Sequence, residues 1–306
     1  MISNYTSRVV CSHGLGNQLF QLTFAHYLKR QTKHQVIFEN NPIFSQGLNY
    51  MLRDMYKYCN HVKYRKNFTI SHNSLFGKTL LKTGKVQFLS ALFMQNSTMK
   101  KNYFYNEADL FHFNHLDTNN HVKKQQYFGF YLNWQYVHSE QKTVMPDILK
   151  LVENKSESFE RKVTGKKTLV VHVRRGDFLT RGNDEILGVI DPSSYKFLIK
   201  SIVNTEPNID IFTITDDEKL AENDYYGSDF GEILTKSEVN EWQALQLMIN
   251  ANYVIAANST FSWWGAALSY FKNGSTCFIP ERFYKNLDDK GSFLLPGLKT
   301  YKNLHL

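Results

Sequence analysis

The stretch TLVVHVRRGDF, residues 168–178, holds the strongest indication of the fold. Its apolar part, Leu169–Val173, has the length and β-branched composition of a buried strand. Two adjacent arginines follow this strand directly, and a glycine and Asp177 come next. The planar fork of a guanidinium group suits bidentate contact with phosphate. We therefore expect an anion, most simply a phosphate group, at the end of this strand.

Side-chain alternation separates the two arginines. Along a strand, His172 and Arg174 point to one face of the sheet, whereas Val173 and Arg175 point to the other. The two guanidinium groups are therefore expected to have different partners. Asp177 can orient one arginine or accept a proton from a hydroxyl, and a structural Arg175–Asp177 pair is the alternative. His172 is either part of the site or a core histidine.

Strands and helices alternate over much of the chain, which is typical of parallel βαβ construction. This pattern predicts two Rossmann-like domains that face a central cleft, because open parallel sheets bind ligands beyond their strand ends. The expected domains are residues 1–160, with a basic helical insert, and residues 161–306. The expected strands are 7–11, 35–38, 169–173, 210–214, 231–234, 253–257 and 276–279; the expected helices are 17–30, 48–58, 144–160, 192–203, 239–250 and 261–271; and the expected linker is 153–167.

Composition excludes several protein classes. The 306 residues are 42% hydrophobic and 21% charged, which is globular rather than disordered. No segment approaches the run of about 20 apolar residues that spans a membrane, and the first residues lack the apolar core of a signal peptide. A cytoplasmic protein is therefore expected. The three cysteines are too widely spaced for a disulfide framework or a zinc site.

The net charge of +8 is unevenly distributed. Residues 57–101 contain nine lysines and arginines, and no acidic residue occurs between Asp54 and Glu107. Such a basic region attracts anionic lipid, and peripheral contact with the inner membrane is one expectation. Contact with nucleic acid is a second interpretation, and a solvated basic face is a third.

A glycine-containing turn, HGLGNQ at residues 13–18, lies between an expected strand and helix. Backbone N–H groups at such a helix start can approach a phosphate. The turn matches neither the lysine-bearing phosphate loop nor GxGxxG, and an ordinary glycine turn is the alternative. The candidate contacts in this turn are Gly14, Gly16, Asn17 and Gln18.

Two further strand ends carry polar groups. The stretch NSTFSWWG, residues 258–265, supplies hydroxyls and free amides at a helix start, and Phe261 or Trp263 can stack on a base. An N-capped helix with buried aromatics is the alternative. The paired carboxylates of Asp216 and Asp217 can bind a ribose or guanine, bind a metal, or cap the next helix.

Taken in order, GLGNQLFQ (14–21), HVRRGDF (172–178), TDD (215–217) and NSTFSWWGAAL (258–268) resemble the α-1,2-fucosyltransferase family, glycosyltransferase family 11. The resemblance implies a GT-B fold and inverting, metal-independent transfer of fucose from GDP-fucose. It implies no cofactor, and as acceptor a galactose-terminated or lipid-linked glycan of bacterial surface polysaccharide. It also implies a cytoplasmic enzyme, membrane-bound at most peripherally, and no nucleic-acid partner.

The resemblance also assigns roles to residues. Arg174 would hold the β-phosphate of the departing GDP, and Asp177 is the nominated general base. The nucleotide-binding set would be His172, Arg174, Arg175, Gly14, Gly16, Asn17, Gln18, Asp216, Asp217, Asn258, Ser259, Thr260, Phe261 and Ser262.

The chain departs from the family pattern at two places. The family usually has glycine at the position of His13. An acidic residue is also common where this chain has Gln243 and Ala244, so Glu238 and Glu241 are the nearest carboxylates for guanine. A fucosyltransferase of another linkage, such as α-1,6, and a basic polyanion-binding protein are the alternative functions.

Overall fold

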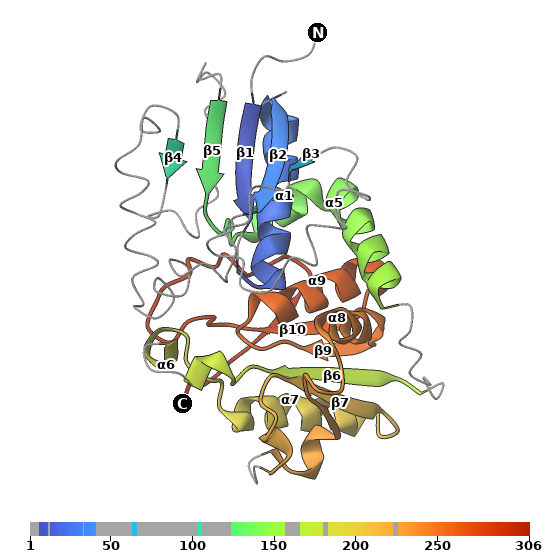
Figure 1. Ribbon diagram of the computed structural model, residues 1–306. Coiled ribbons are helices and arrows are strands. Elements are labelled where there is room, and N and C mark those ends of the chain that lie inside the picture. Colours follow the sequence, from blue (N-terminus) through green and yellow to red (C-terminus); the bar gives the residue numbers. More distant parts are fainter. Residues whose placement is uncertain are drawn as a thin grey trace. The chain divides into compact units, whose positions relative to one another are not determined.

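A computed structural model describes residues 6–11, 13–32, 34–40, 63–65, 103–105, 124–156, 166–179, 183–222 and 226–306 (Figure 1). The chain divides into two compact units. The first comprises Met1–Leu132 and Ser139–Val144, and the second comprises Asn133–His138 and Met145–Leu306. The predicted domain boundary at residue 160, the predicted helix 48–58 and nearly all of the basic region 57–101 lie outside the described residues.

The first unit contains a parallel sheet in the order β3-β2-β1-β5-β4. Helix α1 (Leu15–Thr32) follows β1 and packs on β1 and β2. Because β1 and β5 are parallel neighbours, the segments that follow these two strands meet at one edge of the sheet. The strands are β1 (Thr6–Cys11), β2 (Gln35–Asn40), β3 (Lys63–Arg65), β4 (Tyr103–Tyr105) and β5 (Lys124–Phe128).

The second unit contains a parallel sheet in the order β11-β10-β9-β6-β7-β8. The chain runs outward from β6 to β8 and then returns to β9 on the other side of β6. This is the order of a doubly wound dinucleotide-type sheet, whose ligands bind where the winding reverses. The strands are β6 (Thr168–Val173), β7 (Asp210–Thr215), β8 (Glu232–Leu234), β9 (Tyr253–Ile255), β10 (Thr276–Pro280) and β11 (Lys299–Tyr301).

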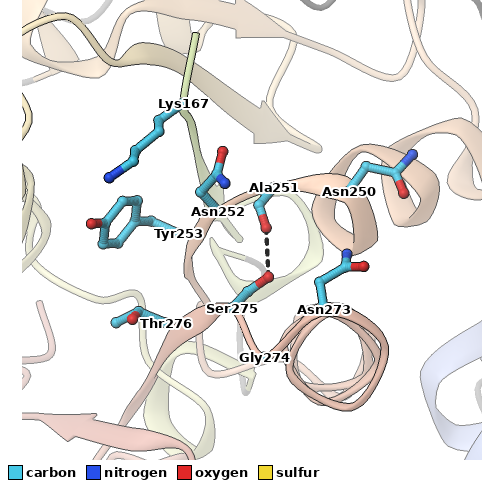
Figure 2. A pocket seen from close by; sticks show the side chains of 9 residues that line it. All are labelled: Lys167, Asn250, Ala251, Asn252, Tyr253, Asn273, Gly274, Ser275 and Thr276. Atoms are coloured by element: carbon cyan, nitrogen blue, oxygen red, sulfur yellow. Dashed lines mark hydrogen bonds between the residues drawn. The ribbon is translucent and has the colours of Figure 1, made fainter. Parts of the chain in front are cut away.

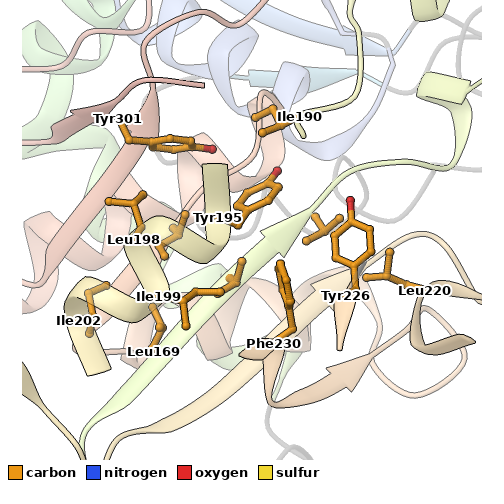
Figure 3. Close-up of a cluster of buried hydrophobic side chains, with 13 residues drawn as sticks. Leu169, Ile190, Tyr195, Leu198, Ile199, Ile202, Leu220, Tyr226, Phe230 and Tyr301 are labelled. Carbon is orange, nitrogen blue, oxygen red and sulfur yellow. The ribbon is translucent and has the colours of Figure 1, made fainter. Parts of the chain in front are cut away.

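Helices cover both faces of the second sheet. Helix α7 (Pro192–Thr205) lies on one face, and α8 (Glu241–Asn250) and α9 (Thr260–Asn273) lie on the other (Figure 1). The α7 side is a continuous apolar cluster in which alternate β6 residues meet Leu198, Ile202, Tyr226 and Phe230 (Figure 3). Because β6 is buried along its whole length, it places its carboxyl end at a fixed position.

Helix α5 (Trp134–Lys155) differs from the predicted helix 144–160. It begins ten residues earlier because Asn133 caps it, with the Asn133 side chain accepting a hydrogen bond from Gln135 N. The helix continues through Pro146, a residue that ordinarily disfavours a helix interior. The sequence pattern also missed β5, whose KQQYF is too polar to show strand periodicity, and the short β11.

Short helical segments complete the second unit. Helix α6 (Asn183–Ile186) and the 3₁₀ turns η3 (Asp177–Leu179), η4 (Leu220–Glu222) and η6 (Ser228–Phe230) follow or connect the strands. Among the described helices, none is both long enough and apolar enough to cross a bilayer.

Candidate active site at the carboxyl ends of the strands

Arg174 lies between two carboxylates at the end of β6. Its Nη1 is 3.0 Å from Asp216 Oδ2, and its Nη2 is 2.7 Å from Asp177 Oδ1. The aromatic ring of Phe178 lies below the guanidinium group, with 5.4 Å from Cζ to the ring centroid. The Arg174 side chain is 25% exposed. The fork is therefore fixed in orientation while one side stays open to solvent.

Asp216 is the structural anchor of this loop. Its Oδ1 accepts hydrogen bonds from the backbone N–H groups of Arg175, at 2.9 Å, and Gly176, at 3.0 Å. Burial opposes ionisation of this carboxyl, but the Arg174 charge and the two N–H donors outweigh burial and hold the pKa of Asp216 below its usual value. The group is therefore an anion at neutral pH that fixes the arginine-bearing turn.

Gly176 is required by the close approach of Asp216. A Cβ atom at this position would lie 2.9 Å from the Asp216 carboxyl carbon, and still closer to its Oδ2. Real Cβ atoms do not approach other atoms this closely, so a larger residue would push the carboxylate out of the turn. The glycine of the HVRRGDF motif thus allows the aspartate from the next strand to enter.

Arg175 has different partners, as side-chain alternation predicts. Its Nε lies 2.9 Å from Asp217 Oδ2, and its guanidinium group lies over the ring of Tyr226 at 5.5 Å. Tyr226 belongs to the apolar cluster on the α7 side (Figure 3). The alternative of an Arg175–Asp177 pair is wrong, because Arg175 points to the opposite face and Asp177 contacts Arg174.

Asp217 caps the next helical segment, which is one of the roles that the sequence left open, and it also pairs with an arginine. Besides pairing with Arg175, its Oδ1 accepts a hydrogen bond from Lys219 N at 3.1 Å, just before η4. The Asp217 side chain is 23% exposed, whereas that of Asp216 is 3% exposed. Both aspartates therefore position the arginines, and the predicted contact of either with a nucleotide stays a prediction.

The point where the winding of the second sheet reverses brings His172 and Phe261 together. The His172 ring at the end of β6 lies 5.6 Å from the Phe261 ring in the first turn of α9. Burial, aided by the Arg174 charge, lowers the pKa of His172 to about 3, so the imidazole is neutral at pH 7. Its Nδ1 is buried and makes no hydrogen bond to any described residue. Phe261 is partly exposed beside it.

The start of α9 contains both partly exposed and buried residues. Ser259 is the N-cap residue, its side chain makes no capping bond, and Thr260 is partly exposed. Trp263 is fully buried and donates from Nε1 to Phe293 O at 2.8 Å. The alternative that Trp263 stacks on a base is therefore wrong, which leaves Phe261 as the aromatic candidate.

Asn258 and Ser262 bond to the chain itself. The Asn258 amide nitrogen donates to the carbonyls of Leu187, Gly188 and Phe283 at 3.0, 3.0 and 3.1 Å. The hydroxyl of Ser262 is fully buried and lies 3.2 Å from the carbonyl oxygens of Ala257 and Ser259. This geometry favours positioning of the neighbouring loops over the nucleotide contacts that we expected for both residues.

The glycine turn of the first unit lies at the carboxyl ends of the neighbouring strands β1 and β5. The His13 ring, after β1, packs edge-on against Phe130, after β5, at 4.6 Å. Gln18 is buried, and its amide nitrogen donates to the carbonyl of His13 at 2.6 Å. His13 has a φ of 67°, a left-handed conformation that favours glycine. The glycine common in the resembled family would fit this position without strain.

The remaining positions of the glycine turn have different exposures. Gly14 is exposed and a Cβ atom there would meet nothing within 4 Å, whereas Gly16 is buried inside α1. Asn17 is partly exposed in the first helical turn. Gly14 and Asn17 are therefore the members of this set that present groups to solvent.

The two carboxylates proposed to contact guanine, Glu238 and Glu241, lie near the start of α8. Gln243 completes a capping box at the start of α8, where its Oε1 accepts a hydrogen bond from Asn240 N at 2.9 Å. Glu238 Oε2 accepts a hydrogen bond from Thr235 N at 2.9 Å. Glu241 is exposed in the first turn of α8. Glu238 is therefore engaged by the backbone, whereas Glu241 faces solvent.

A polar hollow of about 430 Å³ lies at the opposite, amino-terminal edge of the second sheet (Figure 2). Its lining groups bond to the chain itself: Ser275 Oγ donates to Ala251 O at 2.7 Å, and Asn273 Nδ2 donates to Ile249 O at 2.7 Å. Lys167 pairs with Glu206. These internal contacts explain the polarity of the hollow, so we place the chemistry at the carboxyl edge instead.

The described residues contain no group of three or more His, Cys, Asp or Glu side chains arranged to hold a metal ion. Sequence reasoning did find the arginines, the aspartates and Phe261 at one edge of one sheet. It missed Tyr226 and Phe178, whose rings support the two guanidinium groups. Nothing in their spacing marks these aromatic residues, because the chain contains 23 Phe and 18 Tyr.

Comparison with known proteins identifies the family of the chain. The family model of Glycosyl transferase family 11 matches residues 6–287. The O-antigen biosynthesis glycosyltransferase WbnK of Escherichia coli is 27% identical over 288 residues, covering 86% of this chain and 90% of that protein. An alpha-1,2-colitosyltransferase of Escherichia coli is 35% identical over 115 residues, covering 35% of this chain and 38% of that protein.

Among solved structures, fucosyltransferase NodZ from Bradyrhizobium superposes with a TM-score of 0.50 at 11% identity, covering 86% of this chain and 92% of that one. The likeness concerns the fold, and it confirms the predicted α/β, GT-B-like class. The family profile covers most of the chain and includes all four sequence motifs. The resemblance seen in the sequence is thereby confirmed, and the chain belongs to glycosyl transferase family 11, a family of glycosyltransferases.

Proposed function

We propose that this protein transfers L-fucose from GDP-fucose to the 2-hydroxyl of a galactose-type acceptor, with inversion, in the synthesis of a bacterial O-antigen. The observation that carries the proposal is the Arg174 fork, held at the end of β6 by the buried Asp216 and partly open to solvent. Family membership supports glycosyl transfer. The names of two relatives, one for O-antigen biosynthesis and one for an α-1,2 linkage, support the pathway and the linkage.

The roles follow from what each group can do. Arg174 binds the β-phosphate, Arg175 adds positive charge behind it, and the free amides near Ser259 and Thr260 face the nucleotide phosphates. Phe261 offers a face for a ring. The neutral His172 beside Arg174 adds no competing positive charge.

In the reaction, the acceptor hydroxyl oxygen forms a bond to the anomeric carbon of fucose. The bond from that carbon to the β-phosphate oxygen breaks, and GDP leaves with the electron pair. The hydroxyl proton passes to Asp177, the nominated base. Charge builds on the departing phosphate in an oxocarbenium-like transition state, and Arg174 stabilises it electrostatically.

Metal independence is part of the proposal. A fixed guanidinium fork supplies the positive charge that a divalent ion supplies in other nucleotide-sugar sites. Because Asp216 and Asp217 already pair with the arginines, their carboxylates are poorly placed to act together as ligands of a metal ion.

A colitose donor is the second candidate. The relative named as an alpha-1,2-colitosyltransferase shares 35% identity over 115 residues with this chain. Colitose lacks one hydroxyl of fucose, and a site that hydrogen-bonds that hydroxyl rejects the deoxy sugar strongly. A site built for fucose should therefore transfer from GDP-fucose much faster than from GDP-colitose.

The test is a donor panel. Purified protein is incubated with GDP-fucose, GDP-colitose, GDP-mannose or UDP-galactose and a β-galactoside acceptor, with and without EDTA, and the linkage of the product is determined by NMR. We expect an α-1,2-fucosyl product that forms equally in EDTA. Transfer only from another donor, an α-1,6 product, or loss of activity with EDTA would each contradict a distinct part of the proposal.

A further inference from the structure

The two carboxylates on Arg174 differ sharply in how firmly they are held. Asp216 is 3% exposed and also accepts two backbone N–H bonds, whereas the Asp177 side chain is 55% exposed. Exposed ion pairs contribute little to stability, because solvent screens them and side-chain entropy opposes them. Asp216 is therefore a permanent part of the turn, and the contact of Asp177 with Arg174 is cheap to break.

Asp177 covers one nitrogen atom of the Arg174 fork. Asp216 engages Nη1, and the Phe178 ring supports the guanidinium plane, so Arg174 cannot turn freely to offer another edge. The remaining fork nitrogen, Nη2, is the atom that Asp177 contacts at 2.7 Å. An anion that approaches Nη2 thus meets a carboxylate at hydrogen-bond distance from the same nitrogen.

A phosphate and this carboxylate compete for the same donor. Two negatively charged groups in van der Waals contact repel each other, and the repulsion is larger in partly buried surroundings such as those of Arg174 than in water. A diphosphate carries more charge than a carboxylate and offers several oxygen atoms as acceptors for Nη2. The diphosphate is therefore the stronger of the two partners for Nη2.

We propose that Asp177 holds the place of a donor phosphate oxygen on Arg174 and is displaced when the diphosphate binds. The inference rests on the proposed nucleotide-sugar donor. Displacement moves the Asp177 carboxylate off the arginine at the moment when the donor is in place. Donor binding thereby releases the group that accepts the proton of the attacking hydroxyl.

The test compares Asp177→Asn with Asp229→Asn, a matched change of charge on a residue that pairs with Lys200. Binding of GDP, pyrophosphate and guanosine is measured by calorimetry at one ionic strength. For Asp177→Asn we expect GDP and pyrophosphate to bind about fivefold more tightly, with guanosine unchanged. Asp229→Asn should match the natural chain for all three compounds.

Turnover distinguishes the proposed role of Asp177 from a purely structural role. We expect Asp177→Asn to bind the diphosphate more tightly and yet to lose turnover with GDP-fucose, because the displaced base is missing. Unchanged or weaker diphosphate binding by this variant, with normal binding by the natural chain, would overturn the displacement alone. Failure of the natural chain to bind either GDP or pyrophosphate would overturn the proposed donor, and the displacement with it.

Discussion

Arg174 and Asp216 form a 3.0 Å ion pair between the ends of two neighbouring strands. The register of the sheet produces it: Val173 of β6 is paired with Thr215 of β7, so the next residue of each strand reaches the edge together. The cation that we assign to the departing phosphate is therefore positioned by the sheet itself. Changes at this pair should affect both folding and catalysis.

Replacing Asp216 by asparagine should destabilise the protein. The buried carboxylate serves two backbone N–H groups and one guanidinium group, and an amide satisfies these donors incompletely. We expect the free energy of unfolding to fall by about 1–3 kcal/mol, measured by urea denaturation. Asp288→Asn is the control, because Asp288 and Lys290 are both exposed and this change should leave the free energy of unfolding nearly unchanged. Equal stability of the two variants would contradict the anchoring role.

Gly176→Ala should displace the Asp216 carboxylate. A Cβ atom has no room beside it, so the turn must open and the orientation of Arg174 must change. We expect turnover to fall by about 10²-fold, the scale for losing one charge-stabilising donor. Gly14→Ala is the steric control, because no atom lies within 4 Å of a Cβ at that position. Its melting temperature, measured by circular dichroism, should equal that of the natural chain. A Gly176→Ala variant with natural turnover would show that the turn tolerates the side chain.

Stability should depend on pH through His172. Its folded-state pKa of about 3 lies below the usual 6.5, so between these values the unfolded chain binds a proton that the folded chain does not. Stability is therefore lost as pH falls through this window. Between pH 7 and pH 5 the loss from this group is about 2 kcal/mol. Urea unfolding of His172→Gln should show a correspondingly smaller loss, and identical losses would mean that His172 titrates normally.

The left-handed conformation of His13 can be tested by two substitutions. Both His13→Gly and His13→Ala remove the ring contact with Phe130, but only glycine relieves the strain at a φ of 67°. We expect the glycine variant to be more stable than the alanine variant by about 1 kcal/mol in chemical unfolding. An alanine variant of equal or greater stability would rule out a strained conformation at this position.

The sequence predicted the parts of the fold that depend on local pattern. Strand and helix alternation in the second unit was confirmed for β6, α7, β7 and α9, and the helix expected at 192–203 begins at Pro192 with Asp191 as its N-cap. Side-chain alternation correctly separated the partners of the two arginines. These features follow from periodicity and capping, which a sequence displays directly.

Other features depend on contacts that are distant in sequence. Strand order decides that Asp216 enters the arginine turn, and no local pattern reveals the pairing of β6 with β7. The start of α5 was misplaced because Pro146 masked the continuity of the helix. Phe261 and Trp263 could be told apart only by burial and contacts, since both are aromatic residues of the same motif.

The most direct measurement is turnover of Arg174→Ala with GDP-fucose in the presence of EDTA. Arg282→Ala serves as a matched control, because its guanidinium group bonds to Lys285 O in a different loop. We predict that Arg174→Ala loses about 10²- to 10³-fold in kcat with little change in the KM for acceptor, and that Arg282→Ala does not. Near-natural turnover by Arg174→Ala would contradict the role of this arginine in charge stabilisation.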